Sequence, residues 1–370
     1  MSFTDVWQQM NWDDIRLSIY SKTAKDVESA LSKHRLNLED FKSLISPAAE
    51  PYLEKMAQRS VELTRKRFGN TIAFYVPLYL SNLCANACTY CGFSMENRIK
   101  RKTLNSEEIS LELQAIKKMK FDNLLLVTGE HETKVGMNYF RKVLPQIKSK
   151  FSYLSMEVQP LDQDEYAELK ELGLDAVMVY QETYHPSTYS EHHLRGKKTD
   201  FEYRLETPDR LAKAGIDKIG IGALIGLEEW RTDCFYVAKH LQYLEQNYWK
   251  TRYSISFPRL RPCEGELQPK SMMSDKQLVQ LICAYRLFNP EVELSLSTRE
   301  SAIFRDNVLP LGVTSMSAAS KTQPGGYANN ETELEQFSIS DERSAEAVAD
   351  AVRSRGFEVV WKDWHQAYSG

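Results

Sequence analysis

Short apolar runs alternate with amphipathic segments along most of this chain, and this repeat constrains the fold more than any other feature. The runs have strand length and fall at residues 71–80, 124–127, 153–158, 176–180, 218–224, 253–257, 292–297 and 313–316. Segments with helical spacing of apolar residues lie between them, at 106–120, 137–150, 162–172, 202–214, 228–247, 274–288 and 300–307. Parallel strands buried on both faces are apolar throughout, and eight strand–helix units can close into a ring. The pattern therefore predicts an α/β fold, a (β/α)8 barrel of the TIM type, with an open doubly wound sheet as the alternative.

The chain extends beyond this repeat at both ends. Residues 1–70 show helical spacing at 24–33 and 49–67, which predicts an N-terminal helical extension. The repeat itself predicts the barrel over residues 71–320. A polar stretch and a helix-like segment follow, and they predict a C-terminal extension over residues 321–370.

Composition and charge exclude several classes of protein. Hydrophobic residues make up 42% and charged residues 26% of the 370, as in a globular protein with a real core. The net charge of −4 gives no indication of nucleic acid or an anionic membrane as a partner. The first residues, MSFTDVWQQMNWDD, lack the basic start and apolar stretch of a signal peptide, and the longest apolar run is far short of a membrane span. We expect a cytoplasmic protein that binds neither nucleic acid nor membranes.

Three of the six cysteines fall within eight residues, and this cluster needs a chemical explanation. The cysteines are Cys84, Cys88, Cys91, Cys234, Cys263 and Cys283. The first three have the spacing C-x3-C-x2-C and directly follow the first expected strand, in a loop position where such barrels build their active sites. The other three are interpreted as small buried hydrophobes or exposed residues, because disulfides are not expected in a reducing compartment.

Three thiolates can hold three irons of a [4Fe–4S] cluster and leave the fourth iron open, unlike the four cysteines of a ferredoxin. An open iron can chelate the amino and carboxylate groups of S-adenosylmethionine (SAM). Electron transfer into the sulfonium then breaks a C–S bond and yields a 5′-deoxyadenosyl radical. A structural zinc site is the alternative, but zinc would need a fourth ligand from a remote Cys or His.

The cysteine spacing, with an aromatic residue (Tyr90) before the last cysteine, resembles the signature of the radical SAM superfamily. The wider run FYVPLYLSNLCANACTYCGFS resembles the tyrosine lyases of its thiazole-biosynthesis branch. The similarity extends from about residue 10 to residue 365 and includes SLSTRES and FRDNVLPLGVTSMSAASKTQPGGY. It implies that Cys84, Cys88 and Cys91 hold a [4Fe–4S] cluster and that SAM binds beside it.

The resemblance also implies further cofactor-binding residues, in addition to Tyr90. Gly129 and Glu130 stand where the family has Gly-Gly-Glu for the SAM amino group, although Thr128 replaces the first glycine and its effect on SAM binding is open. Arg204 stands where relatives pair an arginine with the SAM carboxylate, a task that suits a planar guanidinium. Leu224 stands where an apolar residue packs on adenine. A solvated loop carboxylate and a surface arginine are the alternatives for Glu130 and Arg204.

Polar residues follow the third and fourth expected strands, at the barrel mouth, where ribose hydroxyls need acceptors. They are Glu157, Gln159, Gln181 and Glu182. By resemblance, Gln181 and Glu182 match the place where relatives bind ribose. Either pair of residues could instead support neighbouring side chains.

Arg299 follows the seventh expected strand, and by resemblance to lyases of aromatic amino acids it binds the substrate carboxylate. Ser315 and Ser317, at the eighth strand, are hydroxyls expected to assist it. A structural pair between Arg299 and Glu300 is the alternative.

The activity implied by the resemblance is cleavage of the Cα–Cβ bond of L-tyrosine to 2-iminoacetate (dehydroglycine) and p-cresol, with SAM cleaved to 5′-deoxyadenosine and methionine. The implied partners are a thiazole synthase, which would receive the labile product, and a reducing electron donor such as flavodoxin. Another radical SAM enzyme acting on an aromatic amino acid and a non-enzymatic metal-binding scaffold are the alternatives. The related hydrogenase-maturation lyase carries a second cluster on C-terminal cysteines, and this chain has no cysteine after Cys283.

Overall fold

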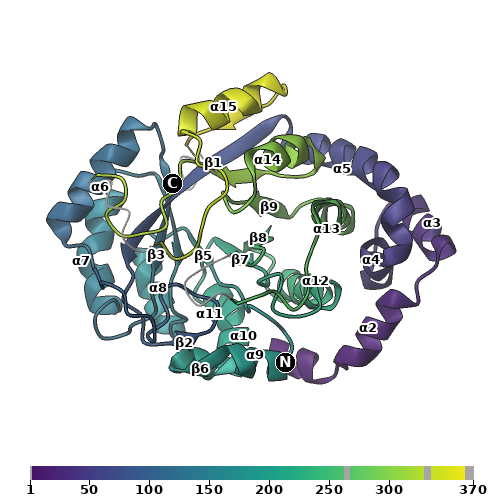
Figure 1. Ribbon diagram of the computed structural model, residues 1–370, viewed down its shortest axis with the longest axis horizontal. Coiled ribbons are helices and arrows are strands. Elements are labelled where there is room, and N and C mark those ends of the chain that lie inside the picture. Colours follow the sequence, from purple (N-terminus) through teal and green to yellow (C-terminus); the bar gives the residue numbers. More distant parts are fainter. Residues whose placement is uncertain (1, 262–266, 329–334, 363–370) are drawn as a thin grey trace.

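Eight parallel strands close into a barrel in the computed structural model, which describes residues 2–261, 267–328 and 335–362 (Figure 1). In spatial order the strands are β1 (Thr71–Ser81), β3 (Asn123–Thr128), β4 (Tyr153–Glu157), β5 (Ala176–Met178), β7 (Lys218–Ile221), β8 (Arg252–Ser256), β9 (Glu293–Leu296) and β10 (Ser315–Ser317). The ring closes where β10 pairs with β1, with Ser315 opposite Ala73. The predicted (β/α)8 barrel is confirmed, and the alternative of an open sheet is wrong.

Helices connect these strands and surround the barrel (Figure 1). They are α6 (Ser106–Lys118), α7 (Met137–Lys148), α8 (Gln163–Glu171), α10 (Phe201–Leu205), α11 (Thr207–Lys213), α12 (Trp230–Asn247), α13 (Asp275–Phe288) and α14 (Ala302–Val308). The single helix expected at 202–214 is two helices, because Pro208 lies in the first turn of α11. Proline has no N–H to donate to the preceding turn, so the chain restarts the helix there.

The sequence pattern did not predict a small antiparallel sheet beside the cluster loop. Its strands are β2 (Ala87–Cys88) and β6 (His193–Arg195), and β6 directly follows α9 (Pro186–His192). Strands of two and three residues are too short to show a period. This pairing joins the cysteine loop to the segment that leads into α10.

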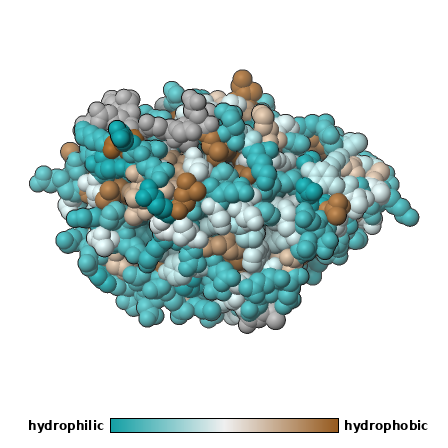
Figure 2. Space-filling model, turned by 60° about the horizontal axis from the view of Figure 1, so that its bottom comes forward, coloured by the Kyte–Doolittle hydropathy of each residue, from teal (hydrophilic) through white to brown (hydrophobic). Residues whose placement is uncertain are grey.

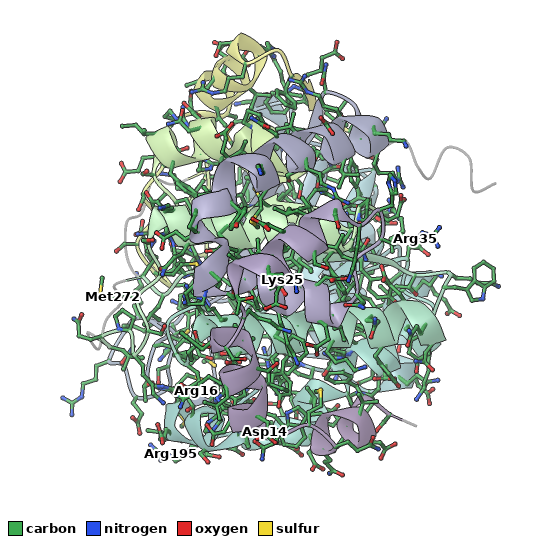
Figure 3. The ribbon with its side chains drawn as sticks, turned by 90° about the vertical axis from the view of Figure 1, so that its right-hand side faces the viewer. Asp14, Arg16, Lys25, Arg35, Arg195 and Met272 are labelled. Atoms are coloured by element: carbon green, nitrogen blue, oxygen red, sulfur yellow. The ribbon has the colours of Figure 1, made fainter. Side chains whose placement is uncertain are left out.

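The N-terminal extension is helical, as predicted. It consists of α1 (Phe3–Gln8), α2 (Trp12–Tyr20), α3 (Ala24–Ser32), α4 (Leu38–Ile45), the 3-10 helix η1 (Pro47–Tyr52) and α5 (Leu53–Phe68). These helices form an arc beside α12 and α13 in Figure 1, and α2, α4 and α5 contact that pair. Their outer faces carry exposed polar side chains such as Asp14, Arg16 and Lys25 (Figure 3). The extension therefore covers one flank of the barrel, and its helices α1 and α2 contact residues in the loops that follow β5 and β7.

The C-terminal extension returns to the barrel. Its helix α15 (Ala345–Ser354) is followed by β11 (Glu358–Val360), which pairs in parallel with the start of β1. Trp361 then packs edge-on against Phe74 and Phe121. The strand was not predicted because it is only three residues long. Trp364 lies outside the described residues.

The described surface seen in Figure 2 is mainly hydrophilic, with hydrophobic residues scattered over it. Trp249 and Met272 are among the large hydrophobic side chains exposed elsewhere along the chain. Within the described ranges, no helix combines the length and the apolar character needed to cross a membrane.

Candidate active site

The three clustered cysteines lie in the loop after β1 and line one cavity at the C-terminal mouth of the barrel. All three are free thiols. Arg101 fixes the loop: its guanidinium donates to the carbonyl oxygens of Asn82 and Phe93 at 2.8 Å and of Ser94 at 2.6 Å. Nothing in the sequence pattern indicated this role for Arg101. The loop is therefore held in shape by the protein itself.

The donor set fits an iron–sulfur cluster. Burial raises the pKa of Cys84 to about 11 and also raises that of Cys88, so the isolated thiols stay protonated at neutral pH and need a cation to become thiolates. In the part of the chain that the structure describes, no three His, Cys, Asp or Glu side chains converge on a single-ion site. A cubane does not require such convergence, because each thiolate binds a different iron.

Gly129 allows the two loops of the site to approach each other. A Cβ at this position would lie 2.3 Å from the carbonyl oxygen of Leu83 and 3.2 Å from the Cβ of Cys84. Any side chain here would push the cysteine loop away. Close packing against the Cys84 segment is therefore a physical reason for glycine, and it is independent of SAM.

Tyr90 points from the cysteine loop to a buried histidine. Its hydroxyl lies 2.8 Å from Nε2 of His193, and Nδ1 of His193 lies 2.7 Å from the carbonyl oxygen of Tyr189. A carbonyl only accepts, so Nδ1 carries the proton and Nε2 accepts from Tyr90. Burial lowers the pKa of His193 to about 3, which keeps the ring neutral at working pH. His193 was not predicted, because its place depends on the β2–β6 pairing.

Two carboxylates and two cations form a buried network on one wall of the cavity, here called the paired side: Glu130, Glu182, Lys198 and Arg204. Nζ of Lys198 lies 2.7 Å from Glu182 and 3.8 Å from Glu130. Arg204 reaches Glu130 at 3.1 Å and Glu182 at 3.4 Å. Burial alone would raise the pKa of Glu182, but Lys198 and Arg204 lower it to about 2. Lys198 is a site residue that sequence reasoning missed.

The paired side is tied to both neighbouring loops. Asn86 of the cysteine loop donates its side-chain amide to Glu130 at 2.7 Å and accepts from the backbone N–H of Lys198 at 3.1 Å. The carbonyl oxygen of Glu182 accepts from the N–H of Leu224 at 2.7 Å, and Leu224 lines the cavity. Glu182 has φ 70°, in the left-handed region that few residues other than glycine adopt. Local strain here places its carboxylate toward the two cations.

The structure does not bring every expected residue into the cavity. Gln159 lines an adjoining pocket, where its amide donates to the carbonyl oxygen of Val135 at 3.0 Å. Gln181 donates to the carbonyl oxygen of Phe201 at 3.4 Å and does not line the cavity. Both amides support neighbouring segments.

Glu157, Arg299 and Ser317 also line the cavity, and these three residues are here called the open side. Glu157 ends β4, between β3 and β5, whereas Arg299 follows β9 and Ser317 ends β10, across the barrel mouth. Arg299 is stacked over the ring of Phe337, 3.4 Å from its centroid, and burial lowers its pKa. Its expected alternative partner, Glu300, is paired elsewhere, with Arg259 and Arg261. The guanidinium of Arg299 therefore has no carboxylate partner among the described residues.

The two serines of β10 lie at different heights along the barrel axis and line different cavities. Ser317 lines the cavity, and its hydroxyl accepts from the N–H of Thr298 at 3.1 Å, next to Arg299. Ser315 lines a second cavity at the opposite, N-terminal end of the barrel, together with small side chains such as Ala73 and Ser155. The expectation that both serines assist Arg299 fits the placement of Ser317 only.

Two family models match the chain. The Radical SAM superfamily matches residues 78–233, and the Biotin and Thiamin Synthesis associated domain matches residues 256–358. The 2-iminoacetate synthases of Escherichia coli (strain K12) and Salmonella typhimurium are each 64% identical to this chain over 98% of its length and 97% of theirs. The chain belongs to the 2-iminoacetate synthase family of radical SAM enzymes. Its cofactors are accordingly a [4Fe–4S] cluster and SAM.

Solved structures place this synthase-family chain among known folds. The crystal structure of HydG, a maturase of the [FeFe]-hydrogenase, superposes with a TM-score of 0.91 at 28% identity, and covers 96% of this chain and 81% of that one. Methylornithine synthase superposes with a TM-score of 0.71 at 21% identity, over 90% of this chain and 97% of its own, which shows a shared fold. The barrel is therefore common to proteins with different activities, and the residues of the cavity decide the chemistry.

Proposed function

We propose that this chain is a tyrosine lyase, which cleaves the Cα–Cβ bond of L-tyrosine to 2-iminoacetate and p-cresol for thiamine thiazole synthesis. The observation that carries the proposal is the 64% identity with 2-iminoacetate synthases over nearly the whole chain. The cavity supports it, because three free thiols and an arginine without a carboxylate partner in the described ranges line the same space. When bound, the cluster and SAM supply a radical that abstracts a hydrogen atom from tyrosine.

Each wall of the cavity has its own task in this proposal. Cys84, Cys88 and Cys91 hold the cluster, while Lys198 and Arg204 offer cations to the SAM carboxylate and Glu130 offers an acceptor to its amino group. On the other wall, Arg299 binds the tyrosine carboxylate. Fixing the carboxylate orients the rest of the amino acid, and orientation decides which hydrogen is removed.

Two of the three remaining cysteines can be placed, and both lie away from the cluster loop. Cys234 is buried on α12 and Cys283 on α13, and neither lines the cavity. Cys263 lies outside the described residues. The sequence has no cysteine after Cys283 that could bind a second cluster as in the hydrogenase-maturation lyase.

The proposed reaction requires two protein partners, one to receive 2-iminoacetate and one to supply electrons. A thiazole synthase would take 2-iminoacetate directly, because an imine of this kind hydrolyses in water. A reducing electron donor such as flavodoxin would reduce the cluster. A reducing compartment, the cytoplasm, would keep the three thiols free for iron.

The test is an anaerobic assay of the reconstituted protein with L-tyrosine, SAM and dithionite. We expect p-cresol, 5′-deoxyadenosine and glyoxylate, the hydrolysis product of 2-iminoacetate, in equal amounts. L-Phenylalanine serves as the matched control substrate. Formation of 5′-deoxyadenosine without p-cresol would leave a radical SAM enzyme with another substrate, and bound zinc without SAM cleavage would indicate a scaffold.

A further inference from the structure

Glu157 differs from the other carboxylates of the cavity. Glu130 and Glu182 are each paired with Arg204 and Lys198. Glu157, the last residue of β4, lines the same cavity, yet it has no hydrogen bond or ion pair with any residue in the described ranges. Glu157 is half-buried and lines the cavity, so a ligand bound there can supply the partner that the described residues do not.

The charges around Glu157 indicate the kind of ligand. Arg299 has the largest attractive effect on it, Glu182 repels it, and Lys198 and Arg204 act more weakly. Tyr75, Tyr79 and Tyr180 also line the cavity, with their hydroxyls hydrogen-bonded to Ser295, Gln336 and Ser256, and burial raises the pKa of all three. A cation and an unpaired carboxylate that line one cavity from opposite sides of the barrel mouth complement the carboxylate and ammonium of an α-amino acid held between them. If Arg299 takes the substrate carboxylate, the ammonium on the adjacent carbon lies toward Glu157.

We propose that Glu157 is a catalytic base, which receives the ammonium of bound L-tyrosine and removes one proton from it. This inference rests on the proposed function. The N–H bond of the ammonium breaks heterolytically, its electron pair stays on nitrogen, and the proton goes to a carboxylate oxygen of Glu157. The products of this step are a neutral amine and a carboxylic acid, so charge and atoms balance without an added reactant. Abstraction of a hydrogen atom from nitrogen then acts on an amine instead of an ammonium.

The surroundings of Glu157 suit a base at neutral pH. Burial raises its pKa to about 7, against the attraction of Arg299. Above that pH the carboxylate is ionised and can accept a proton, and below it the group is already protonated and cannot. The p-cresol rate should therefore fall as pH decreases through about 7.

Binding measurements test the contact with the ammonium directly. In the cluster-loaded enzyme with SAM, Glu157→Gln should weaken L-tyrosine binding about tenfold, the loss of one charge-assisted contact. It should leave the affinity for 3-(4-hydroxyphenyl)propanoate unchanged, because this analogue has the carboxylate and phenol but no amine. Glu171→Gln, at an exposed position at the end of α8, is the matched control. Equal affinity for tyrosine in the wild type and in Glu157→Gln would overturn the proposal.

Rate measurements test the proton transfer. Glu157→Gln should form p-cresol about 100-fold more slowly at pH 7 and recover as pH rises toward the pKa of the free amino group. The change that SAM causes in the electron paramagnetic resonance spectrum of the reduced cluster should be the same as in the wild type. An altered SAM response, the sign of a ribose ligand, would overturn the proposal, as would a normal p-cresol rate at pH 7.

A second variant covers the case in which Glu157→Gln fails to fold. Glu157→Asp keeps the charge but withdraws it by one methylene, so p-cresol formation should slow while SAM affinity stays unchanged. Weaker SAM binding with an unchanged p-cresol rate at saturating SAM would overturn the proposal. Absence of p-cresol from the wild-type protein would instead contradict the proposed function, which keeps the two failures distinct.

Discussion

The residues of the paired side and of the open side meet their charges in opposite ways. On the paired side, two carboxylates and two cations already satisfy each other at 2.7 to 3.8 Å. On the open side, Arg299 and Glu157 have no ionic partner among the described residues, although burial shifts the pKa of each toward its neutral form. A ligand on the paired side must therefore be inserted into existing ion pairs. A ligand on the open side completes charges that the protein leaves unbalanced.

Loss of the iron–sulfur cluster should have the largest effect, because both SAM cleavage and tyrosine cleavage depend on it. Cys88→Ala should abolish cluster binding, so the iron content falls to background and neither 5′-deoxyadenosine nor p-cresol forms. Cys283→Ala is the control, because Cys283 is a buried core residue on α13, outside the cavity. Iron analysis after anaerobic reconstitution decides. A Cys88→Ala protein that kept four irons and cleaved SAM would remove this residue from the cluster.

Breaking the paired side should cost both stability and SAM use. Lys198→Met leaves Glu182 with Arg204 alone, and removing one partner of a buried pair typically costs about 3–5 kcal/mol. The pKa of Glu182 is lowered to about 2, so this stabilisation is present above the carboxyl's unfolded pKa and is lost only as pH falls toward 2. At pH 7 to 8 the full loss should appear as a lower midpoint of thermal unfolding and a higher KM for SAM.

Lys197→Met is the matched control for that change. Lys197 is the neighbouring residue, and its side chain is 71% exposed, in an ion pair with Glu132 at the surface. Exposed pairs contribute about 0–1 kcal/mol, so this variant should unfold close to the wild type. Equal destabilisation by the two variants would mean that the buried network contributes no more to the free energy of unfolding than the exposed Lys197–Glu132 pair.

Breaking the open side should spare SAM and affect tyrosine. Arg299→Ala removes the cation proposed for the substrate carboxylate, and loss of a bidentate charged contact of about 3 kcal/mol corresponds to roughly 100-fold in the KM for tyrosine. SAM cleavage should continue without coupled product, so the ratio of p-cresol to 5′-deoxyadenosine falls. Arg299→Lys keeps the charge but not the planar guanidinium, so its ratio of p-cresol to 5′-deoxyadenosine should lie between those of the wild type and Arg299→Ala. A normal ratio in Arg299→Ala would remove it from the substrate site.

The sequence predicts the parts of this site that depend on the barrel alone. The strand–helix repeat predicts the fold, and because all strands end at one mouth, it also brings the cysteines, Glu130, Glu157 and Arg299 together. Lys198 and His193 were missed because they lie in a segment with no period, which the three-residue strand β6 and the loop after it position. No local pattern could indicate that Lys198 reaches back to Glu182.

Depth along a strand is the other property that the sequence hides. Residues two apart on a strand share a face, so Ser315 and Ser317 are equivalent in the sequence pattern. In the barrel they are separated by roughly 6–7 Å along the axis of the strand, and they line cavities at opposite ends. Gln159 shows the same limit, since it follows Glu157 by two residues but lies past the end of β4 and lines another pocket.

Replacing either serine of β10 should change turnover only slightly, and only Ser317 should matter. Ser317→Ala removes an acceptor for the N–H of Thr298, and a net loss of about 0.5–1.5 kcal/mol in fixing the adjacent Arg299 corresponds to roughly 2- to 12-fold in kcat/KM for tyrosine. Ser315→Ala changes the cavity at the N-terminal end of the barrel and should leave kcat/KM as in the wild type. The same small loss of kcat/KM in both variants would mean that the cavity at the N-terminal end of the barrel takes part in tyrosine turnover. Residues that affect tyrosine turnover would then reach from the mouth cavity, which Ser317 lines, to the cavity at the N-terminal end of the barrel, which Ser315 lines.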